Sequence, residues 1–362
     1  MNADNGQASG RPIRGRGAGG NPKNRFLPLY VERDPEWQDP DDPGPQTVLL
    51  RDTTRTAIAK NSSPDVGFER SINPYRGCEH GCIYCYARPT HEYLGFSAGL
   101  DFETKILVKE TLPELLRNEL LSPRWQPQVI VISGVTDPYQ PTERRLRLTR
   151  RCLEVLAEFR NPVGMITKNY LVTRDIDVLK ELAAYDCVGV SLSVTSLRNE
   201  IQSVMEPRTS IPARRLKAIE ELANAGIPVG VNVAPVIPGL TDHEMPKILE
   251  AAANAGAVRA GYIMLRLPYA VAPLFEQWLE QHFPDRKEKV LNRLRALRGG
   301  LLYRSEWGSR MRGEGVFAEQ LESMFDVSCR KLGLNRDHRR LSTEHFRRPP
   351  PVARGPQLGL FG

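Results

Sequence analysis

The sequence predicts an α/β fold in which about six β/α units form an open, partial (β/α)6 barrel of the TIM-like kind. Two observations carry this prediction: short β-branched segments recur along the middle of the chain, and amphipathic segments alternate with them. Segments that are apolar on successive residues suit strands buried on both faces. Alternation with helices indicates a parallel sheet with right-handed crossovers. In such a barrel the site residues lie at the carboxyl ends of the strands.

The elements follow in order along the chain. A first strand is expected just before residue 78, and the later ones cover residues 129–133, 163–167, 188–194, 229–234 and 262–267. Apolar residues at helical spacing over 148–159, 216–223 and 248–252 predict helices, the last two ending before the capping glycines Gly226 and Gly256. After the last strand, residues 272–297 and 314–333 are expected to be helices that cover an open barrel edge or extend a substrate groove.

The two ends of the chain have a different composition. Residues 1–25 hold six glycines and five basic residues against one acid, and residues 34–45 hold five acids and four prolines. Such stretches bury too little apolar surface to offset their ordering entropy. We therefore expect four parts: a flexible arm and linker over 1–45, the barrel over 46–270, a helical extension over 271–335 and a flexible tail over 336–362.

Length and composition bound the class of protein. The chain has 362 residues, of which 40% are hydrophobic and 26% charged, which excludes a wholly disordered chain. No apolar run approaches the roughly 18 residues of a membrane span, so no membrane partner is expected. Six cysteines are too few for a disulfide scaffold and no secretory signal is visible, so a cytoplasmic, reducing location is expected. The net charge of +7 permits contact with a polyanion without demanding it.

Three cysteines are concentrated in the segment NPYRGCEHGCIYCYARP. Cys78, Cys82 and Cys85 have the spacing C-x3-C-x2-C, and three thiolates on one loop can hold an iron–sulfur cluster. Because a cubane usually takes four thiolates, one iron would lack a protein ligand and could bind a substrate or cofactor. The alternative is a zinc site completed by His80, although structural zinc sites usually use two separated ligand pairs.

With Tyr84 in the aromatic place, C-x3-C-x-aromatic-C resembles the signature of the radical S-adenosylmethionine (radical SAM) superfamily. The resemblance covers roughly residues 70–270. It implies a partial barrel whose cysteine loop binds a [4Fe–4S] cluster, the fourth iron of which chelates S-adenosylmethionine. It further implies electron delivery from a flavodoxin- or ferredoxin-type donor, cleavage of the sulfonium to a 5′-deoxyadenosyl radical, and hydrogen abstraction from a substrate.

The flanking segments resemble the spore photoproduct lyase-like branch of that superfamily. The similar segments are RSINPYRGCEHGCIYCYARP, SGVTDPYQPTE, ITKN, SLSVTS and APVIPGLTD, each at the end of an expected strand. This branch makes DNA a hypothetical partner, with repair lyase or base-modifying chemistry. The sequence leaves open two alternatives: a radical enzyme acting on a small molecule or protein, and a non-catalytic module that binds a metal or cluster.

The resemblance also assigns cofactor-binding roles by position. Tyr84 matches the aromatic residue beside the adenine, and Thr136 matches a residue that contacts the methionyl amino group or the ribose. Lys168 resembles the lysine that meets the methionyl carboxylate. Ser193 matches a ribose-binding serine. Each has an ordinary alternative, such as an exposed loop lysine or a hydroxyl bonded to its own backbone.

Tyr86 matches a catalytic tyrosine that relays hydrogen atoms in the lyase, and its alternative is an aromatic ring packed under the cluster. The lyase's hydrogen-donating cysteine has no counterpart, because Gly134, Val135 and Thr136 occupy that segment. Cys152 and Cys187 are expected in the core.

Two further sets of charged residues each leave two roles open. Glu206-Pro207-Arg208 is expected either to clamp a phosphate or the cofactor carboxylate, or to form a salt-bridged loop. Asp137 and Glu143 are candidates for acid–base groups or for stabilising turns.

The chain ends in QLGLFG. Gln357, Leu358, Leu360 and Phe361 resemble the peptide that binds the bacterial sliding clamp, with Gly359 departing from its pattern. A short apolar plug on a Pro/Arg linker can dock into a hydrophobic pocket, so the clamp is a second hypothetical partner. The alternatives are a tail folded back on the barrel and a chance match.

Overall fold

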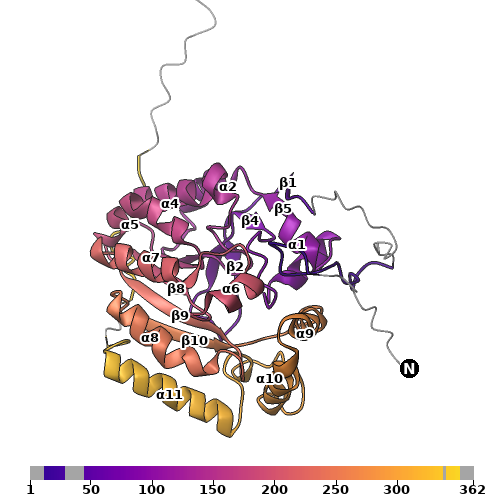
Figure 1. The fold of residues 1–362 in the computed structure, drawn as a ribbon. Helices are drawn as coiled ribbons and strands as arrows, with labels where there is room; N and C mark the ends of the chain where they lie inside the picture. The colour runs from indigo at the N-terminus through magenta and orange to yellow at the C-terminus, as the bar shows by residue number, and fades with distance from the viewer. Residues whose placement is uncertain (1–11, 29–44, 337–339, 351–362) are drawn as a thin grey trace, which may run out of the picture.

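Six parallel strands form the centre of the protein in the computed structural model, which describes residues 12–28, 45–336 and 340–350 (Figure 1). The sheet order is β10-β9-β8-β7-β6-β3-β2, and only the short edge strand β2 (Ala59–Lys60) is antiparallel to its neighbour. The expected partial (β/α)6 barrel is confirmed. Its parallel strands are β3 (Arg70–Ile72), β6 (Ile130–Ile132), β7 (Val163–Thr167), β8 (Val188–Ser193), β9 (Val229–Val236) and β10 (Arg259–Met264).

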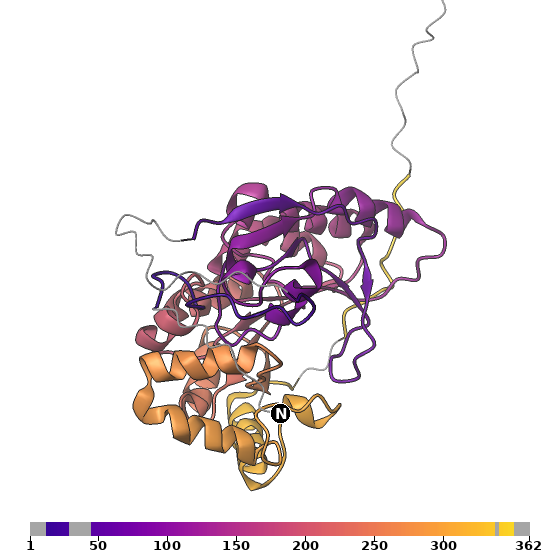
Figure 2. The ribbon, with the colours of Figure 1, turned by 90° about the vertical axis from the view of Figure 1, so that its right-hand side faces the viewer.

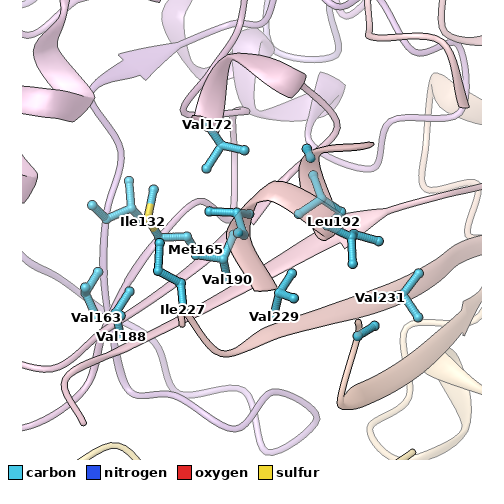
Figure 3. Packing of buried hydrophobic residues seen from close by; sticks show 14 of the residues in the cluster. Ile132, Val163, Met165, Val172, Val188, Val190, Leu192, Ile227, Val229 and Val231 are labelled. Carbon is cyan, nitrogen blue, oxygen red and sulfur yellow. The ribbon is translucent and has the colours of Figure 1, made fainter. Parts of the chain in front are cut away.

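The main core lies between this sheet and the helices on its outer face. Figure 3 shows β-branched side chains of neighbouring strands, such as Val163 and Val188, close together, with Met165 and Val190 beside them. Strands covered in this way favour β-branched residues, which pack well on a pleated surface. The helices on the outer face are α2 (Leu112–Leu121), α4 (Leu148–Phe159), α5 (Ile176–Ala183), α7 (Pro212–Asn224) and α8 (Met245–Asn254).

A second, three-stranded sheet frames the cysteine segment and was not expected from the sequence. It has the order β1-β5-β4, with β1 (Val48–Arg51) parallel to β5 (Lys105–Val108) and β4 (Tyr75–Arg76) antiparallel to it. The cysteines follow β4 directly, and a 3-10 helix, η1 (Arg88–Leu94), and α1 (Leu100–Thr104) lead from them to β5. Both ends of the cysteine segment are therefore tied to one small sheet.

Four short helical segments lie in the connections of the barrel, and a fifth follows the barrel. They are α3 (Glu143–Leu146), η2 (Tyr170–Asp175), α6 (Asn199–Met205), η3 (Asp242–Glu244) and, after the barrel, η4 (Ser309–Met311).

The helices that follow the barrel pack against two different parts of it. The helix expected over residues 272–297 is two helices, α9 (Val271–His282) and α10 (Pro284–Ala296), because Pro284 cannot continue α9 and begins the next helix (Figure 2). Trp278 and Leu291 of this pair share a buried cluster with Cys82 and Tyr84. In contrast, α11 (Val316–Leu332) packs beside α8 and joins the barrel core.

Residues 12–28 differ from the flexible arm expected over residues 1–45, because they pack against the segment around α1. The backbone amides of Gly17 and Ala18 donate to the two carboxylate oxygens of buried Glu103, at 3.0 and 2.8 Å. Asn24 donates to the carbonyls of Glu92 and Phe96. The segment has few apolar side chains, and it is held mainly by polar contacts of its backbone and of asparagine and arginine side chains.

Residues 340–350 also differ from the flexible tail expected over residues 336–362. Arg347 donates its backbone amide to Phe159 O and its side chain to Glu158 O, while Arg348 donates to Ser122 O and Trp125 O. The carbonyls at a helix C-terminus lack partners within the helix, and cationic donors suit them. These arginines supply donors at the ends of α4 and α2. Among the described residues, no helix is long and apolar enough to cross a membrane.

Candidate active site at the cysteine loop

The cysteine loop, residues 78–85, is held by backbone hydrogen bonds to distant parts of the chain. Cys78 N donates to Phe102 O at 2.9 Å, and Ile83 N donates to Met205 O at 3.1 Å. Gly81 has φ +64°, and an added Cβ would lie 2.6 Å from a carboxylate oxygen of Glu103. The loop therefore needs glycine at this position both for its backbone conformation and for the close approach of Glu103.

Arg88 fixes the inner side of this loop. Its guanidinium is fully buried and donates to the carbonyls of Gly81, Cys82, Ala98 and Gly99, at 3.0 to 3.1 Å. The same group forms an ion pair with Glu103. A buried ion pair with all donors used holds its surroundings in one geometry, and removing either partner leaves an uncompensated charge.

The donor set fits an iron–sulfur cluster. Cys78, Cys82 and Cys85 are free thiols, the first two buried and the third half-buried. Burial and the neighbouring Cys78 raise the pKa of Cys85 to about 11. In the described part of the chain, no three Cys, His, Asp or Glu side chains converge as ligands of one metal ion do. Three cysteine side chains, which bind as thiolates, are the ligand type that an iron–sulfur cluster takes.

His80, the fourth ligand in the zinc alternative, has other contacts. Asn169 uses its carbonyl oxygen to accept from Leu171 N and Ser210 Oγ, so its amide nitrogen donates to His80 Nε2 at 3.1 Å. The other ring nitrogen, Nδ1, lies 3.4 Å from a carboxylate oxygen of Asp137. Nδ1 has no hydrogen-bond partner among the described residues, and although burial alone would lower the pKa of His80, the charges of Asp137 and Cys78 raise it to about 10.

A buried network around Glu206 supports the inner face of the site. Glu206 accepts from Tyr84 and Arg215, and from Thr195 at 2.8 Å. Burial alone would raise the pKa of this carboxyl, but the charges of Arg215 and Lys168 lower it to about 2. Of the two roles left open for Glu206-Pro207-Arg208, the structure has the salt-bridged loop, because Glu206 pairs with Arg215 and Arg208 lies 3.4 Å from Glu79.

Lys168 and Tyr84 come together in the structure, as expected for parts of one site. Lys168 Nζ lies 5.7 Å from the centre of the Tyr84 ring and 3.5 Å from Glu206, and it donates to Ala234 O at 2.9 Å. Lys168 follows β7, and Ala234 lies in the carboxyl-terminal half of β9. Ser193 is buried at the end of β8, and its carbonyl accepts from Arg215.

Thr136 is engaged in protein contacts. Its hydroxyl donates to Gly77 O at 2.8 Å and accepts from the Gln140 amide at 3.0 Å. Gly77 immediately precedes Cys78, so this hydroxyl braces the cysteine loop. A cofactor contact for Thr136 stays a prediction of the resemblance.

Asp137 and Glu143 hold turns together, which was one of the two roles left open for them. Asp137 accepts from Thr167 Oγ1 and from the backbone amides of Lys168 and Tyr139. Glu143 is fully buried and accepts from Tyr75, Arg174 and the amide of Thr149.

Tyr86 lies in the open mouth of the barrel, with 48% of its surface exposed. Its hydroxyl donates to Gly134 O, just beyond β6, at 2.6 Å. On the other side, the guanidinium carbon of Arg266, just beyond β10, lies 4.4 Å from the centre of its ring. One side chain thus spans the carboxyl ends of two strands that are four positions apart in the sheet.

Several residues of this site could not be predicted from the sequence. Arg88, Glu103, Thr195 and Arg215 are far apart in the chain, and single charged or hydroxyl residues carry no spacing signal. The expected partner-binding residues Gln357, Leu358, Leu360 and Phe361 lie outside the described residues.

A three-thiol loop above the carboxyl ends of six parallel strands defines a class of partial-barrel proteins built to hold an iron–sulfur cluster. The chain belongs to the radical SAM superfamily, whose family model matches residues 72–252. This family implies a [4Fe–4S] cluster and S-adenosylmethionine as cofactors, and the cysteine loop fits the first of these.

Two relatives are similar to part of this chain, and the name of the second includes radical SAM. An uncharacterized protein of Mycobacterium tuberculosis (strain H37Rv) is 37% identical over 220 residues, which are 60% of this chain and 65% of the relative. A radical SAM Nalpha-GlyT isomerase of Pseudomonas phage M6 is 26% identical over 223 residues, 61% of this chain and 44% of that protein. The match therefore spans less than two thirds of either relative.

The fold is similar to that of spore photoproduct lyase. A structure of a double mutant of that lyase, with bound AdoMet and dinucleoside spore photoproduct, superposes with a TM-score of 0.57. The two chains are 17% identical, and the superposition covers 79% of this chain and 80% of the lyase. At this identity the likeness concerns the fold.

Proposed function

We propose that this protein is a radical SAM enzyme that acts on nucleic acid, in a lyase or base-modifying reaction. The observation that carries the chemistry is the braced three-thiol loop, which includes Tyr84 and lies beside Lys168 and Tyr86 at the mouth of the barrel. When bound, the cluster supplies the electron that cleaves S-adenosylmethionine to the 5′-deoxyadenosyl radical.

The residues of this chain supply binding and positioning. Cys78, Cys82 and Cys85 hold the cluster. Lys168, whose Nζ lies 5.7 Å from the centre of the Tyr84 ring, offers a charge-assisted contact to the methionyl carboxylate. Ser193, at the end of β8, offers a hydroxyl to the ribose. These contacts orient the cofactor between the loop and the strand ends.

Tyr86 is the catalytic candidate on the substrate side. It is exposed at the mouth, adjacent in sequence to Cys85, and its hydroxyl is directed to Gly134. In this position it can pass a hydrogen atom between the cofactor side and a substrate in the mouth. No cysteine occurs in 133–136, so a different donor must return hydrogen if the reaction is of the lyase type.

Three observations support nucleic acid as the substrate class. The net charge is +7, the fold is similar to that of a lyase solved with a dinucleoside photoproduct, and the guanidinium of Arg266 lies over the ring of Tyr86 at the mouth. Arg310 lies over the exposed ring of Trp307 in the same way. Flat aromatic faces and guanidinium groups bind bases and phosphates together.

The test is anaerobic reconstitution with iron and sulfide, followed by addition of S-adenosylmethionine and a reductant. We expect 5′-deoxyadenosine to form with the natural chain and with Cys152→Ala, a core cysteine, and not with Cys82→Ala. Ultraviolet-irradiated duplex DNA should increase the yield and be altered in the process. If deoxyadenosine forms but no nucleic acid increases it, the substrate is a small molecule or protein. If none forms in the fully loaded protein, the enzymatic proposal fails.

A further inference from the structure

Three arginines rank among the largest fully buried side chains of the described residues: Arg88, Arg215 and Arg298. Arg88 pairs with Glu103, and Arg215 pairs with Glu206. Arg298 differs from both, because no carboxylate of the described chain pairs with it. It donates to Leu265 O at 2.7 Å and Arg310 O at 3.2 Å, and its Nε has no partner among the described residues.

Arg266 adds a second uncompensated charge next to the first. It is half-buried, and its guanidinium has neither an ion-pair partner nor a hydrogen-bond acceptor in the described chain, only the face of Tyr86 at 4.4 Å. Burial and the charge of Arg266 hold the pKa of Arg298 below its usual value. Burial and the charge of Arg310 likewise lower the pKa of Arg266.

The third arginine of this group is already satisfied. Arg310 forms an ion pair with Asp65 and donates to Ser63. In the part of the chain that the structure describes, the local balance is therefore three guanidinium groups and one carboxylate. Desolvating a guanidinium without a counter-charge is unfavourable, so an arrangement of this kind calls for an anion that the described residues do not supply.

The position of the unpaired charge indicates which anion would enter. Arg266 lies at the carboxyl end of β10, on the face of Tyr86 at the barrel mouth, where a substrate has to approach. The guanidinium of Arg266 matches the oxygens of phosphate, and the buried charge of Arg298 behind it adds to the attraction for a strongly charged group. An exposed aromatic ring beside them offers a surface for a base.

We propose that Arg266, backed by Arg298, forms a phosphate-binding subsite beside Tyr86 that positions a nucleic-acid substrate at the mouth of the barrel. The subsite deepens the proposed function and relies on it for the nucleic acid. Arg266 is the contacting residue. Arg298 is a positioning residue, whose charge and bonds to Leu265 and Arg310 hold the backbone around Arg266.

The test compares Arg266→Gln with Arg286→Gln, which removes an exposed charge from α10. A fluorescent oligonucleotide is titrated with each reconstituted protein at several salt concentrations. We expect Arg266→Gln to bind the oligonucleotide at least tenfold more weakly. The slope of log association constant against log salt concentration should become less steep by about one. Arg286→Gln should match the natural chain. Equal affinity of the natural chain and Arg266→Gln would overturn the subsite and leave the proposed function standing.

Thermal unfolding separates a ligand-binding arginine from a structural one. Removing an uncompensated charge should leave the Tm of Arg266→Gln unchanged or higher, whereas a drop of several degrees would show a structural role and overturn the proposal. Pyrophosphate should raise the Tm of the natural chain and not of Arg266→Gln. This result would support the subsite even if no oligonucleotide bound, in which case the nucleic-acid proposal alone would fail. A loss of S-adenosylmethionine affinity in Arg266→Gln would assign the group to the cofactor and overturn the subsite.

Discussion

The backbone amide of Gly17 donates to a carboxylate oxygen of Glu103 at 3.0 Å. The same carboxylate pairs with Arg88, which holds the carbonyls of Gly81 and Cys82. A segment near the start of the chain and the cysteine loop thus share one buried acid. The stability of the N-terminal segment and that of the cysteine loop are coupled, because moving Glu103 away from either one leaves a buried donor unpaired.

Gly17→Ala should release this N-terminal segment. A Cβ at Gly17 would lie 1.8 Å from Gly81 O, which is backbone and cannot move aside cheaply. We expect limited trypsin digestion to cleave after Arg16, Lys23 or Arg25 at least tenfold faster in the variant. Gly67→Ala is the matched control, because its Cβ would meet nothing within 4 Å. Equal cleavage rates in the natural chain and Gly17→Ala would show that the segment is not held there in solution.

Thr136→Val distinguishes bracing of the loop from binding of the cofactor. The variant loses the hydrogen bond to Gly77 O and should unfold with about 1 kcal/mol less free energy. If the hydroxyl only braces the loop, affinity for S-adenosylmethionine should stay within twofold by isothermal titration. A tenfold weaker affinity would support the cofactor contact that the resemblance implies. Thr173→Val, which loses a bond to Tyr170 O, controls for stability alone.

Glu206→Gln should destabilise the protein strongly at neutral pH. Since the variant leaves buried Arg215 without its counter-charge, we expect a loss of about 3–5 kcal/mol in urea unfolding. The folded pKa of about 2 lies below the ordinary value for glutamate, so this stabilisation is present above about pH 4.5 and lost as pH falls toward 2. The difference in unfolding free energy between the natural chain and Glu206→Gln should therefore narrow as pH falls from about 4.5 toward 2. Glu220→Gln, in a surface pair with Lys217, should cost less than about 1 kcal/mol.

His91 gives the protein a second pH dependence, at higher pH. Burial lowers the pKa of His91 to about 4, below the usual 6.5, so the folded state resists protonation of the ring. The contribution of neutral His91 to the free energy of unfolding is fully present above about pH 6.5, and about 3 kcal/mol of it is lost as pH drops toward 4. His91→Gln should flatten the unfolding free energy over this range. His243→Gln, at an exposed position, should keep the full dependence. The same slope in both variants would assign the effect to other groups.

Periodicity predicted the barrel well because most of its strands are buried on both faces. The strand at residues 163–167 has the expected bounds, while β10 begins and ends three residues earlier than expected. Leu265 and Leu267 extend the apolar run, but they belong to the cluster around α9 and α10. A run of apolar residues therefore indicates that its side chains are buried, but it does not show whether they belong to the strand or to the segment after it.

The cysteine spacing predicted the location of the site, and the resemblance brought Tyr84 and Lys168 to it. The ion pairs of Arg88 with Glu103 and of Arg215 with Glu206 could not be predicted in this way. Their members are brought together only by the fold, and the sequence contains many other acids and bases. The bound segment 12–28 was missed for a related reason, because its contacts use backbone amides that every residue has.

The contacts of Arg347 and Arg348 have a mechanical consequence. They fasten the chain to the ends of α4 and α2, whereas the cysteine loop faces the opposite ends of the strands. A pull on the chain beyond residue 350 would be resisted first by these arginines and by Phe346 on Phe159. The force would then act on the outer helices α2 and α4. A tether attached on this side would leave the cysteine loop, at the carboxyl ends of the strands, undistorted.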